Sequence, residues 1–388
     1  ADAVGGACSF LNVEANLMTS RIVIALLVVT SFCACGSDSV MMPDLERGLH
    51  EVGNLTRPRN LHVTALLQNG KVLIAGGNAA LPPAGGGVWE SEGLVSAEIF
   101  DPETGISTPT GDMTIGRYED HGILLADGRV LIISSFIPRH PIEMYYPHSG
   151  GFDAVADAPF TFGTRSATLL PNGKVLLIGA SPAGGRWRVF DPTAGTLSDT
   201  IAMDHPGYGH TATLLKDGRV LIVGGKLFGG EWLPGRNFIY DPSTEAFSEA
   251  GSLQVDRILH KAVLLQDGRV MIVGGYRRDG RRAQTPEIYN PETNTFSPAG
   301  TSVMDPLAAL LLPSGRVFFI HRDNGNIALY NPDTQVFSPT GHSIGPWRSG
   351  LTVTLLDDGR VLIAGGLKTT DGGHSPESIT DQIFIFTP

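Results

Sequence analysis

Short runs of apolar residues, separated by Asp-Gly or Asn-Gly pairs, recur along most of the chain. Seven of them share the pattern Leu-Leu-x-(Asp/Asn)-Gly-(Arg/Lys)-Val-Leu-Ile with small variations, and Ser314 replaces the Asp in the sixth. Their glycines lie 44 to 58 residues apart and are Gly70, Gly128, Gly173, Gly218, Gly268, Gly315 and Gly359. A recurrence of roughly 40–50 residues is typical of repeated supersecondary units such as propeller blades.

Each copy predicts two antiparallel strands joined by a tight turn. Asp-Gly or Asn-Gly between apolar runs favours a type I′ turn, because Asn, Asp and Gly tolerate positive φ. In the fourth copy we expect the strands at His210–Leu215 and Arg219–Val223. The second strand is almost entirely Val, Leu and Ile, which is typical of a strand covered on both faces. It usually ends at a Gly-Gly pair such as Gly224-Gly225.

A second pattern, in which an aliphatic and an aromatic residue precede Asp-Pro or Asn-Pro, follows most hairpins after a loop of variable length. It occurs at Ile99–Pro102, Val189–Pro192, Ile239–Pro242, Ile288–Pro291 and Leu329–Pro332. The Asx-Pro pair favours a type I turn in which the Asx side chain accepts a backbone hydrogen bond. Segments such as Thr295–Ser297 and Gln335–Ser338 then predict a fourth, outer strand. These repeats predict an all-β, seven-bladed β-propeller of four-stranded antiparallel blades.

The seventh repeat supplies only three strands before Pro388. An early segment, Leu49–Leu55, resembles the outer-strand sequence Phe296–Ser302 and precedes the first hairpin. We therefore expect this N-terminal strand to close the last blade, beside Ile383–Phe386. Closure removes the sheet edges that an open propeller would expose.

These units resemble Kelch repeats, of the bacterial type related to the central propeller of galactose oxidase. The resemblance rests on the His-x-x-x-Leu-Leu starts, the Gly-Gly pairs and the Tyr-Asp-Pro-x-Thr-x-x-Phe turns, and it covers residues 45–388. It implies a Kelch-type propeller fold. It implies little about activity, because function on a shared scaffold depends on the site built onto it.

Galactose and glyoxal oxidases, which share this blade pattern, depend on a copper site that includes a tyrosine cross-linked to a cysteine. The three cysteines of this chain, Cys8, Cys33 and Cys35, all precede the repeats, so that cofactor cannot form within them. No sequence-local cluster of His, Asp or Cys has the spacing of a metal site. We therefore expect no cofactor and no metal, and we assign no catalytic residue.

The N-terminal residues have the pattern of an export signal. Met18–Arg21 give a charged start, and the apolar run that follows, 22–32, is shorter than the roughly 20 residues that span a bilayer. The run ends at Cys33-Ala34-Cys35, which resembles a bacterial lipoprotein processing site with Cys35 as the lipidated residue. We interpret 1–17 as upstream read-through, 18–35 as the signal peptide, 36–44 as a short tether and 45–388 as the propeller. The protein is thus expected in the bacterial cell envelope, lipid-anchored to a membrane and facing the periplasm or cell surface.

The formal net charge of −11 bears on the choice of partner. Nucleic-acid binding requires a basic surface, so a nucleic-acid partner is not expected. Membrane contact is expected only through the lipid anchor. The remaining partners are a protein or a glycan.

Candidate binding residues follow from the strand order, which places the starts of the first strands and the ends of the second strands on one face. Four residues before the Leu-Leu pair lie His62, Asp120, Arg165, His210 and His260, and three residues earlier lie Arg59, Arg117, Arg257 and Arg348. Equivalent positions project to equivalent places around the axis, so these residues predict a ring suited to a carboxylate or sugar ligand. The alternative, which we prefer for any single residue, is that they are structural and join neighbouring blades.

Departures from the repeat supply further candidates. His321 and Arg322 occupy the place of the usual Gly-Gly pair. The variable loops on the same face carry Trp89, Trp232, Arg277 and Arg278. Exposed aromatic residues on such loops suit sugar stacking or protein contacts, and they equally suit packing within the loops.

Two functions remain open from the sequence. The first is an exported, membrane-anchored propeller that binds a protein or carbohydrate through its loop face. The second is a periplasmic carbohydrate-modifying enzyme, a sugar-acid epimerase or an oxidase-like protein, that uses Arg, His and Asp at the central mouth. A convergent cluster of such groups in the central cavity favours the enzyme, and a flat, aromatic-rimmed face favours recognition. We prefer recognition.

The lipoprotein pattern makes a direct prediction about Cys35. Membrane fractions of a bacterial host should contain the wild-type protein, and Cys35→Ala should release or mislocalise it because the acylated residue is lost. Cys33→Ala is the matched control and should leave anchoring unchanged. Metabolic labelling with a fatty-acid probe checks this, and an unlabelled wild type would contradict the lipoprotein interpretation.

Overall fold

The computed structural model describes residues 45–79, 93–134, 140–157, 159–160, 163–181, 184–203, 207–226, 236–300, 305–345, 348–370 and 375–388. Met41–Pro388 form one compact unit, and the regular structure of its described residues consists of β-strands. No helix in the described part of the chain is long and apolar enough to cross a membrane. The export signal, the tether and Cys35 lie outside the described residues.

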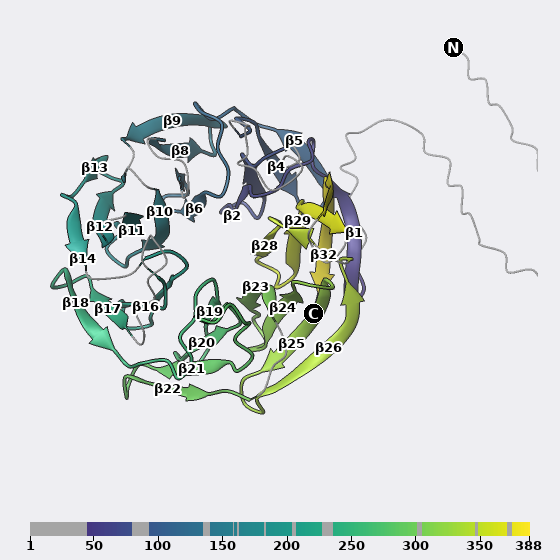
Figure 1. Cartoon of the computed structure of the whole chain (residues 1–388). Coiled ribbons are helices and arrows are strands. Elements are labelled where there is room, and N and C mark those ends of the chain that lie inside the picture. Colours follow the sequence, from purple (N-terminus) through teal and green to yellow (C-terminus); the bar gives the residue numbers. More distant parts are fainter. Residues whose placement is uncertain are drawn as a thin grey trace, which may run out of the picture. The chain divides into compact units, whose positions relative to one another are not determined.

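Seven four-stranded antiparallel blades form a ring, and we number them by their first strands (Figure 1). The first strands lie innermost and are β2 (Val63–Leu66), β6 (His121–Leu124), β10 (Thr164–Leu169), β15 (Thr211–Leu214), β19 (Lys261–Leu264), β23 (Pro306–Leu311) and β28 (Thr352–Leu355). The second strands are β3 (Val72–Ala75), β7 (Val130–Ile133), β11 (Val175–Ser181), β16 (Val220–Val223), β20 (Val270–Val273), β24 (Val317–His321) and β29 (Val361–Ala364). The third strands are β4 (Ala97–Asp101), β8 (Ile142–Tyr146), β12 (Gly184–Asp191), β17 (Asn237–Asp241), β21 (Glu287–Asn290), β25 (Asn326–Asn331) and β32 (Gln382–Thr387). The outer strands are β5 (Ile106–Pro109), β9 (Gly151–Ala156), β13 (Thr196–Leu197), β18 (Ala246–Ala250), β22 (Thr295–Pro298), β26 (Val336–Ser343) and β1 (Gly48–Asn54).

The ring carries two further elements, an extra strand and an extra sheet. A fifth strand, β14 (Ile201–Met203), pairs with β12 in blade 3. In the segments that precede β28 and connect β29 to β32, β27 (Arg348–Ser349), β30 (Leu367–Thr370) and β31 (Ser375–Ile379) form a small separate sheet. The predicted seven-bladed propeller is confirmed, and the additional sheet belongs to the loops.

The hydrophobic core lies between the blades. Every residue of β3, β7, β16, β20 and β29 is buried, as the Val/Leu/Ile runs predict. Each apolar cluster joins two neighbouring blades; Leu73 of blade 1, for example, clusters with Val130 and Ile132 of blade 2. Seven such clusters occupy the seven junctions. Stability is therefore shared between neighbours, as in other repeat proteins.

An aromatic pair joins the third strand to the outer strand in several blades. The ring centroids of Tyr289 and Phe296 are 4.9 Å apart, and those of Tyr330 and Phe337 are 4.6 Å apart. These are the Tyr and Phe of the repeated turn pattern, so their spacing reflects packing across the turn. The Asx side chain acts as predicted, since Asn290 Oδ1 accepts a hydrogen bond from the Glu292 backbone N–H at 2.9 Å.

The turn between the first and second strands differs from the expected type I′ geometry. In blade 4 only the glycine has positive φ, 87° at Gly218. Its N–H donates to the Leu215 carbonyl at 3.1 Å, and the Leu215 N–H donates to the Arg219 carbonyl at 2.8 Å. This pattern is that of a type I turn followed by a glycine bulge. Asp217 Oδ1 accepts from the Arg219 N–H at 3.0 Å, which explains the recurrent Asp or Asn before the glycine.

The N-terminal strand closes the ring, as predicted. β1 pairs antiparallel with β32 from Gly48 opposite Thr387 to Asn54 opposite Gln382, with one irregularity near Val52. Figure 1 shows the two strands side by side, one from each end of the described chain. Leu55 adds a buried side chain to the cluster between blades 7 and 1.

Hydroxyl–imidazole hydrogen bonds join neighbouring first strands at three junctions, and we call each such pair a pin. Thr352 Oγ1 lies 2.8 Å from His62 Nε2 and connects blade 7 to blade 1. The equivalent pairs, Ser166–His210 and Thr211–His260, have the same 2.8 Å separation. In each pin the hydroxyl comes from one blade and the histidine from the start of the next. The predicted structural role of these histidines thus has a defined geometry.

Closure predicts that β1 is essential for the whole propeller. A chain starting at Thr56 should unfold with a free energy more than about 5 kcal/mol below that of a chain starting at Leu45. The deletion removes several apolar side chains from the closing junction, and each large buried one contributes about 2–5 kcal/mol. Denaturant unfolding measures the difference. Equal midpoints for the two chains would contradict the dependence on closure.

Candidate ligand-binding site

A cavity of about 780 Å³ opens at the centre of the face where the first strands start. The predicted shared face is confirmed, because the start of β15 pairs with the end of β16. Residues of blades 2 to 6 line the cavity, and its charged and aromatic lining residues are Glu119, His121, Arg165, Tyr208, His210, His260, Lys261, Tyr276 and Arg322.

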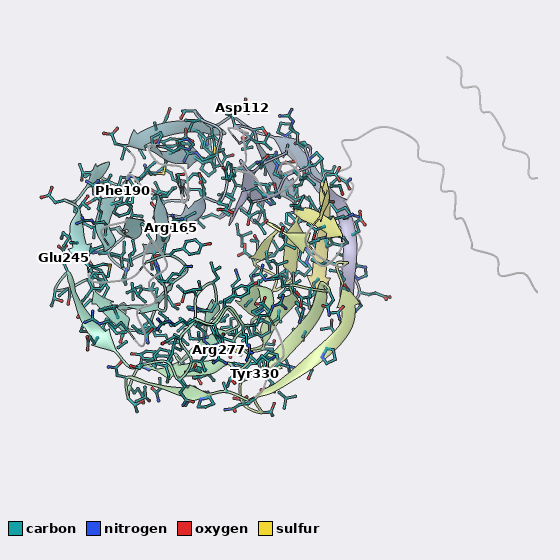
Figure 2. The ribbon with its side chains drawn as sticks, in the orientation of Figure 1. Asp112, Arg165, Phe190, Glu245, Arg277 and Tyr330 are labelled. Atoms are coloured by element: carbon teal, nitrogen blue, oxygen red, sulfur yellow. The ribbon has the colours of Figure 1, made fainter. Side chains whose placement is uncertain are left out.

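Four of the residues singled out from the sequence meet in this cavity: Arg165, His210, His260 and Arg322. Figure 2 shows Arg165 towards the centre of the ring, whereas Glu245 lies at its outer edge. Arg165 is placed by an irregularity at the start of β10, where the register shifts between Thr164 and Ser166. Its guanidinium lies 5.4 Å from the centre of the Tyr208 ring, a cation–π geometry.

The cavity histidines are neutral at physiological pH. Burial lowers the pKa of His210 to about 4 and that of His260 to about 3. Burial also lowers the pKa of His121 to about 4, against a hydrogen bond with Thr164 that raises it. In these sites the desolvation of an imidazolium outweighs the hydrogen bonds that would favour it. The histidines therefore contribute polarity and no positive charge.

The arginines three residues before the strand starts do not form an accessible ring. Arg59, Arg117 and Arg257 are buried, with 0–1% of each exposed. Each pairs with a buried glutamate of its own blade's third strand, as Arg257 does with Glu287 at 2.7 Å; the other pairs are Arg59–Glu98 at 2.8 Å and Arg117–Glu143 at 3.1 Å. Arg348 is also buried and donates to Gln382 Oε1 at 2.5 Å. This geometry corrects the expected cationic ring: these side chains hold loops onto blades.

Two strand-start residues have structural partners as well. His62 forms the closing pin, and Asp120 pairs with Arg117 at 3.3 Å. Both border a smaller cavity of about 270 Å³ on the same face. His321 supports its own turn, because its Nδ1 accepts a hydrogen bond from the Asp323 N–H at 3.1 Å.

Two of the loop candidates, Arg277 and Arg278, lie apart from the cavity of about 780 Å³. Arg277 and Arg278 are exposed and line a separate hollow of about 350 Å³ beside Asp256. Trp89 and Trp232 lie outside the described residues. Sequence reasoning therefore named some cavity residues together with others that the fold keeps away from it.

Sequence reasoning missed Glu119, His121, Tyr208, Lys261 and Tyr276. The sequence pattern could have identified two of these residues, His121 and Lys261. The hydroxyl position of the pins is Ser or Thr in three blades, whereas His121 and Lys261 occupy it in blades 2 and 5. A titratable side chain at this position marks a departure from the structural pattern. The remaining residues converge only in the folded ring.

Glu119 is held at the cavity by an unusual backbone conformation. Its φ is 57°, and its N–H donates to the Leu61 carbonyl of blade 1 at 2.8 Å. Such positive φ is uncommon for a residue other than glycine. Reduced solvation raises the pKa of the Glu119 carboxyl, and the charge of Arg165 opposes this rise.

Arg322 belongs to an ion-pair network at the other side of the cavity. Its Nε lies 3.0 Å from Asp305 Oδ2, and the Arg282 Nε lies 3.5 Å from the same oxygen. Arg282 also forms a bidentate pair with Asp323. The buried Asp305 carboxylate therefore holds two guanidinium groups in place.

Residues 258–301, which contain all four strands of blade 5, match the Kelch motif. The chain is a seven-bladed β-propeller that contains a Kelch motif in blade 5. Among solved structures, the propeller is similar to a fungal alcohol oxidase of the AA5 family in complex with copper. The TM-score is 0.65 at 15% identity, over 88% of this chain and 77% of that one. Comparison with curated proteins finds no match. At this identity the similarity concerns the fold alone.

The described residues of this propeller do not fit the copper site of such an oxidase. Among the described residues, no group of three or more His, Cys, Asp or Glu side chains converges as metal ligands. The sequence also has no cysteine after Cys35 to cross-link with a tyrosine. The similarity to the oxidase therefore gives no reaction for this chain.

The buried histidines predict that acid destabilises the propeller. The pKa of His260 is about 3 in the folded chain, against 6.5 for an unburied histidine. Below pH 6.5 this histidine is protonated in the unfolded chain but stays neutral in the folded chain. The free energy of unfolding therefore decreases as the pH falls from 6.5 towards the folded-state pKa. The slope is at most about 1.4 kcal/mol per pH unit and histidine.

His260→Asn should shrink the loss of melting temperature between pH 7.5 and pH 5. It should also lower stability at pH 7.5, because the bond to Thr211 is lost. His148→Asn, at an exposed position, is the control and should behave like the wild type. Parallel pH profiles for His260→Asn and the wild type would count against this account.

Proposed function

We propose that this propeller is an exported binding module that holds a small anionic carbohydrate, such as a sugar acid, in its central cavity. The observation that carries the proposal is the presence of three cationic side chains, Arg165, Lys261 and Arg322, around one cavity of about 780 Å³. A protein of net charge −11 repels anions in general. A local group of cations gives the cavity a positive potential, which attracts an anion despite the negative net charge of the protein.

The charge of the cavity supports an anion. Glu119 is the carboxylate among its lining residues, and the lining histidines are neutral at pH 7. Arg165 and Arg322 each offer several N–H donors in a planar arrangement that matches a carboxylate. A carboxylate-bearing ligand would therefore gain charge-assisted hydrogen bonds there.

The shape of the cavity supports a small ligand. Its volume lies within the roughly 300–1,000 Å³ range of small-molecule sites. Tyr208 and Tyr276 add aromatic surface against which a sugar ring can pack. A concave, polar cavity suits a sugar acid better than it suits a protein surface. Export and lipid anchoring at Cys35 belong to the proposal on the sequence pattern alone.

One observation favours the enzyme alternative as a second candidate. The Nε2 atom of His121 is buried and has no hydrogen-bond partner among the described residues. A neutral imidazole beside a bound sugar acid is able to accept a proton from it. Proton NMR of a sugar acid incubated with the protein distinguishes the two, because an epimerase changes the sugar and a binding module does not.

The binding proposal predicts that glucuronate binds saturably and that glucose does not. Arg165→Gln should weaken glucuronate binding about 10-fold or more, since hydrogen bonds to charged groups contribute about 1.5–3 kcal/mol. Arg278→Gln, an exposed arginine outside the cavity, is the matched control and should change affinity less than twofold. Isothermal titration calorimetry measures both. Equal affinity for glucose and glucuronate would overturn the proposal.

A further inference from the structure

Lys261 occupies a position where the structural pattern of the repeat is interrupted. It begins β19, at the place where Thr211 and Thr352 supply the hydroxyl of a pin. The residue that should complete its pin in blade 6 is Leu307, whose side chain forms no hydrogen bond. The described residues give the Lys261 ammonium no hydrogen-bond or ion-pair partner. This amine is therefore left to the cavity that it lines.

The surroundings of Lys261 make its amine easier to deprotonate than that of an exposed lysine. Burial lowers the pKa of the amine, the nearby Arg322 guanidinium lowers it further, and Asp305 opposes both. Asp305 is a weak counter-charge because it already binds Arg322 at 3.0 Å and Arg282 at 3.5 Å. His260, the residue before Lys261, is neutral at pH 7 and adds no charge. Desolvation next to a second cation is a known way to turn a lysine into a nucleophile.

We propose that Lys261 forms an imine with the carbonyl group of a carboxylate-bearing ligand whose carboxylate is held by Arg322. This deepens the proposed function and rests on it, because a sugar acid carries a carboxylate and, in its open-chain form, an aldehyde. The cavity then holds the ligand by a reversible covalent bond as well as by charge.

The reaction needs no oxidant or reductant. The neutral Nζ of Lys261 attacks the carbonyl carbon, a C–N bond forms, and the π electron pair of the carbonyl moves to its oxygen. A proton passes from the nitrogen to this oxygen, which gives a carbinolamine. The hydroxyl then takes a proton from solvent and leaves as water, while the nitrogen lone pair forms the C=N bond. The protonated imine returns that proton to solvent when it becomes neutral. Addition of water reverses each step and releases the ligand.

Glyoxylate is the probe, because it combines an aldehyde with a carboxylate and fits a cavity of this size. The full chain is incubated with glyoxylate and cyanoborohydride at pH 7, which converts an imine at lysine to stable carboxymethyl-lysine. Peptide mass spectrometry then measures the rate at each lysine. Lys261 should react at least tenfold faster than the exposed Lys71 and Lys174 and should show saturation with glyoxylate.

Two comparisons separate recruitment by charge from simple exposure. Propionaldehyde, which lacks the carboxylate, should lose most of the preference for Lys261 in the wild type. Arg322→Gln should slow the reaction of Lys261 with glyoxylate and should affect its reaction with propionaldehyde less.

Lys261→Arg keeps the positive charge and should abolish the fast adduct. Glucuronate should compete with glyoxylate for the site.

The outcomes are distinguishable from those of the binding test. If glucuronate binds and Lys261 reacts no faster than Lys71, the imine proposal is overturned and the binding proposal stands. If Lys261 reacts quickly and saturably while glucuronate fails to bind or compete, the nucleophile is supported and the sugar-acid ligand is not. A fast reaction without any preference for glyoxylate over propionaldehyde overturns the role of Arg322. Failure of both experiments overturns both proposals.

Discussion

The pairing of β1 with β32 is the contact on which the rest of the propeller depends. Each blade buries one face of its second strand against the preceding blade and the other face against the following blade, so no blade has a complete core alone. The seven apolar clusters at the junctions form a closed cycle only because the last junction is completed by a strand from the other end of the sequence. The pin between Thr352 and His62 reinforces the same junction. Closure also fixes the central cavity, because its walls are first strands of separate blades.

The candidate site lies where the structural pattern of the repeat is broken. At three junctions a hydroxyl and a histidine form a hydrogen bond across neighbouring blades. This bond occupies groups that would otherwise be available to bind a ligand. Where blade 6 presents Leu307 to Lys261, the pin is absent and a charged group is left at the cavity. The same logic applies to Arg322, which replaces a glycine and extends from the end of β24 into the lining. Function in a repeat protein is thus to be sought among the departures from its consensus.

Most charged groups that recur in the sequence serve the fold. The buried pairs of Arg59, Arg117 and Arg257 with glutamates connect the segment before each first strand to the third strand of the same blade. Removing one partner would leave an uncompensated buried charge, which is strongly destabilising. Recurrence at equivalent positions is therefore a poor guide to a ligand site here. The cations of the cavity, by contrast, occur once each.

The repeat period, the hairpin pattern and the Asx-Pro turns determined the fold of this protein from the sequence alone, including the closing strand Leu49–Leu55. These features are local, or they repeat, so their physical meaning can be read without knowing distant neighbours. The sequence also determined that no cysteine serves the propeller. Only the tertiary structure decided that Arg165, Lys261 and Arg322 share one cavity while Arg117 and Arg257 are buried in pairs. The glutamate partner of Arg257 lies 30 residues further along the chain, and the cavity residues come from five blades. Which side chains meet at the axis is set by the closure of the ring, and no local pattern in the sequence encodes that convergence.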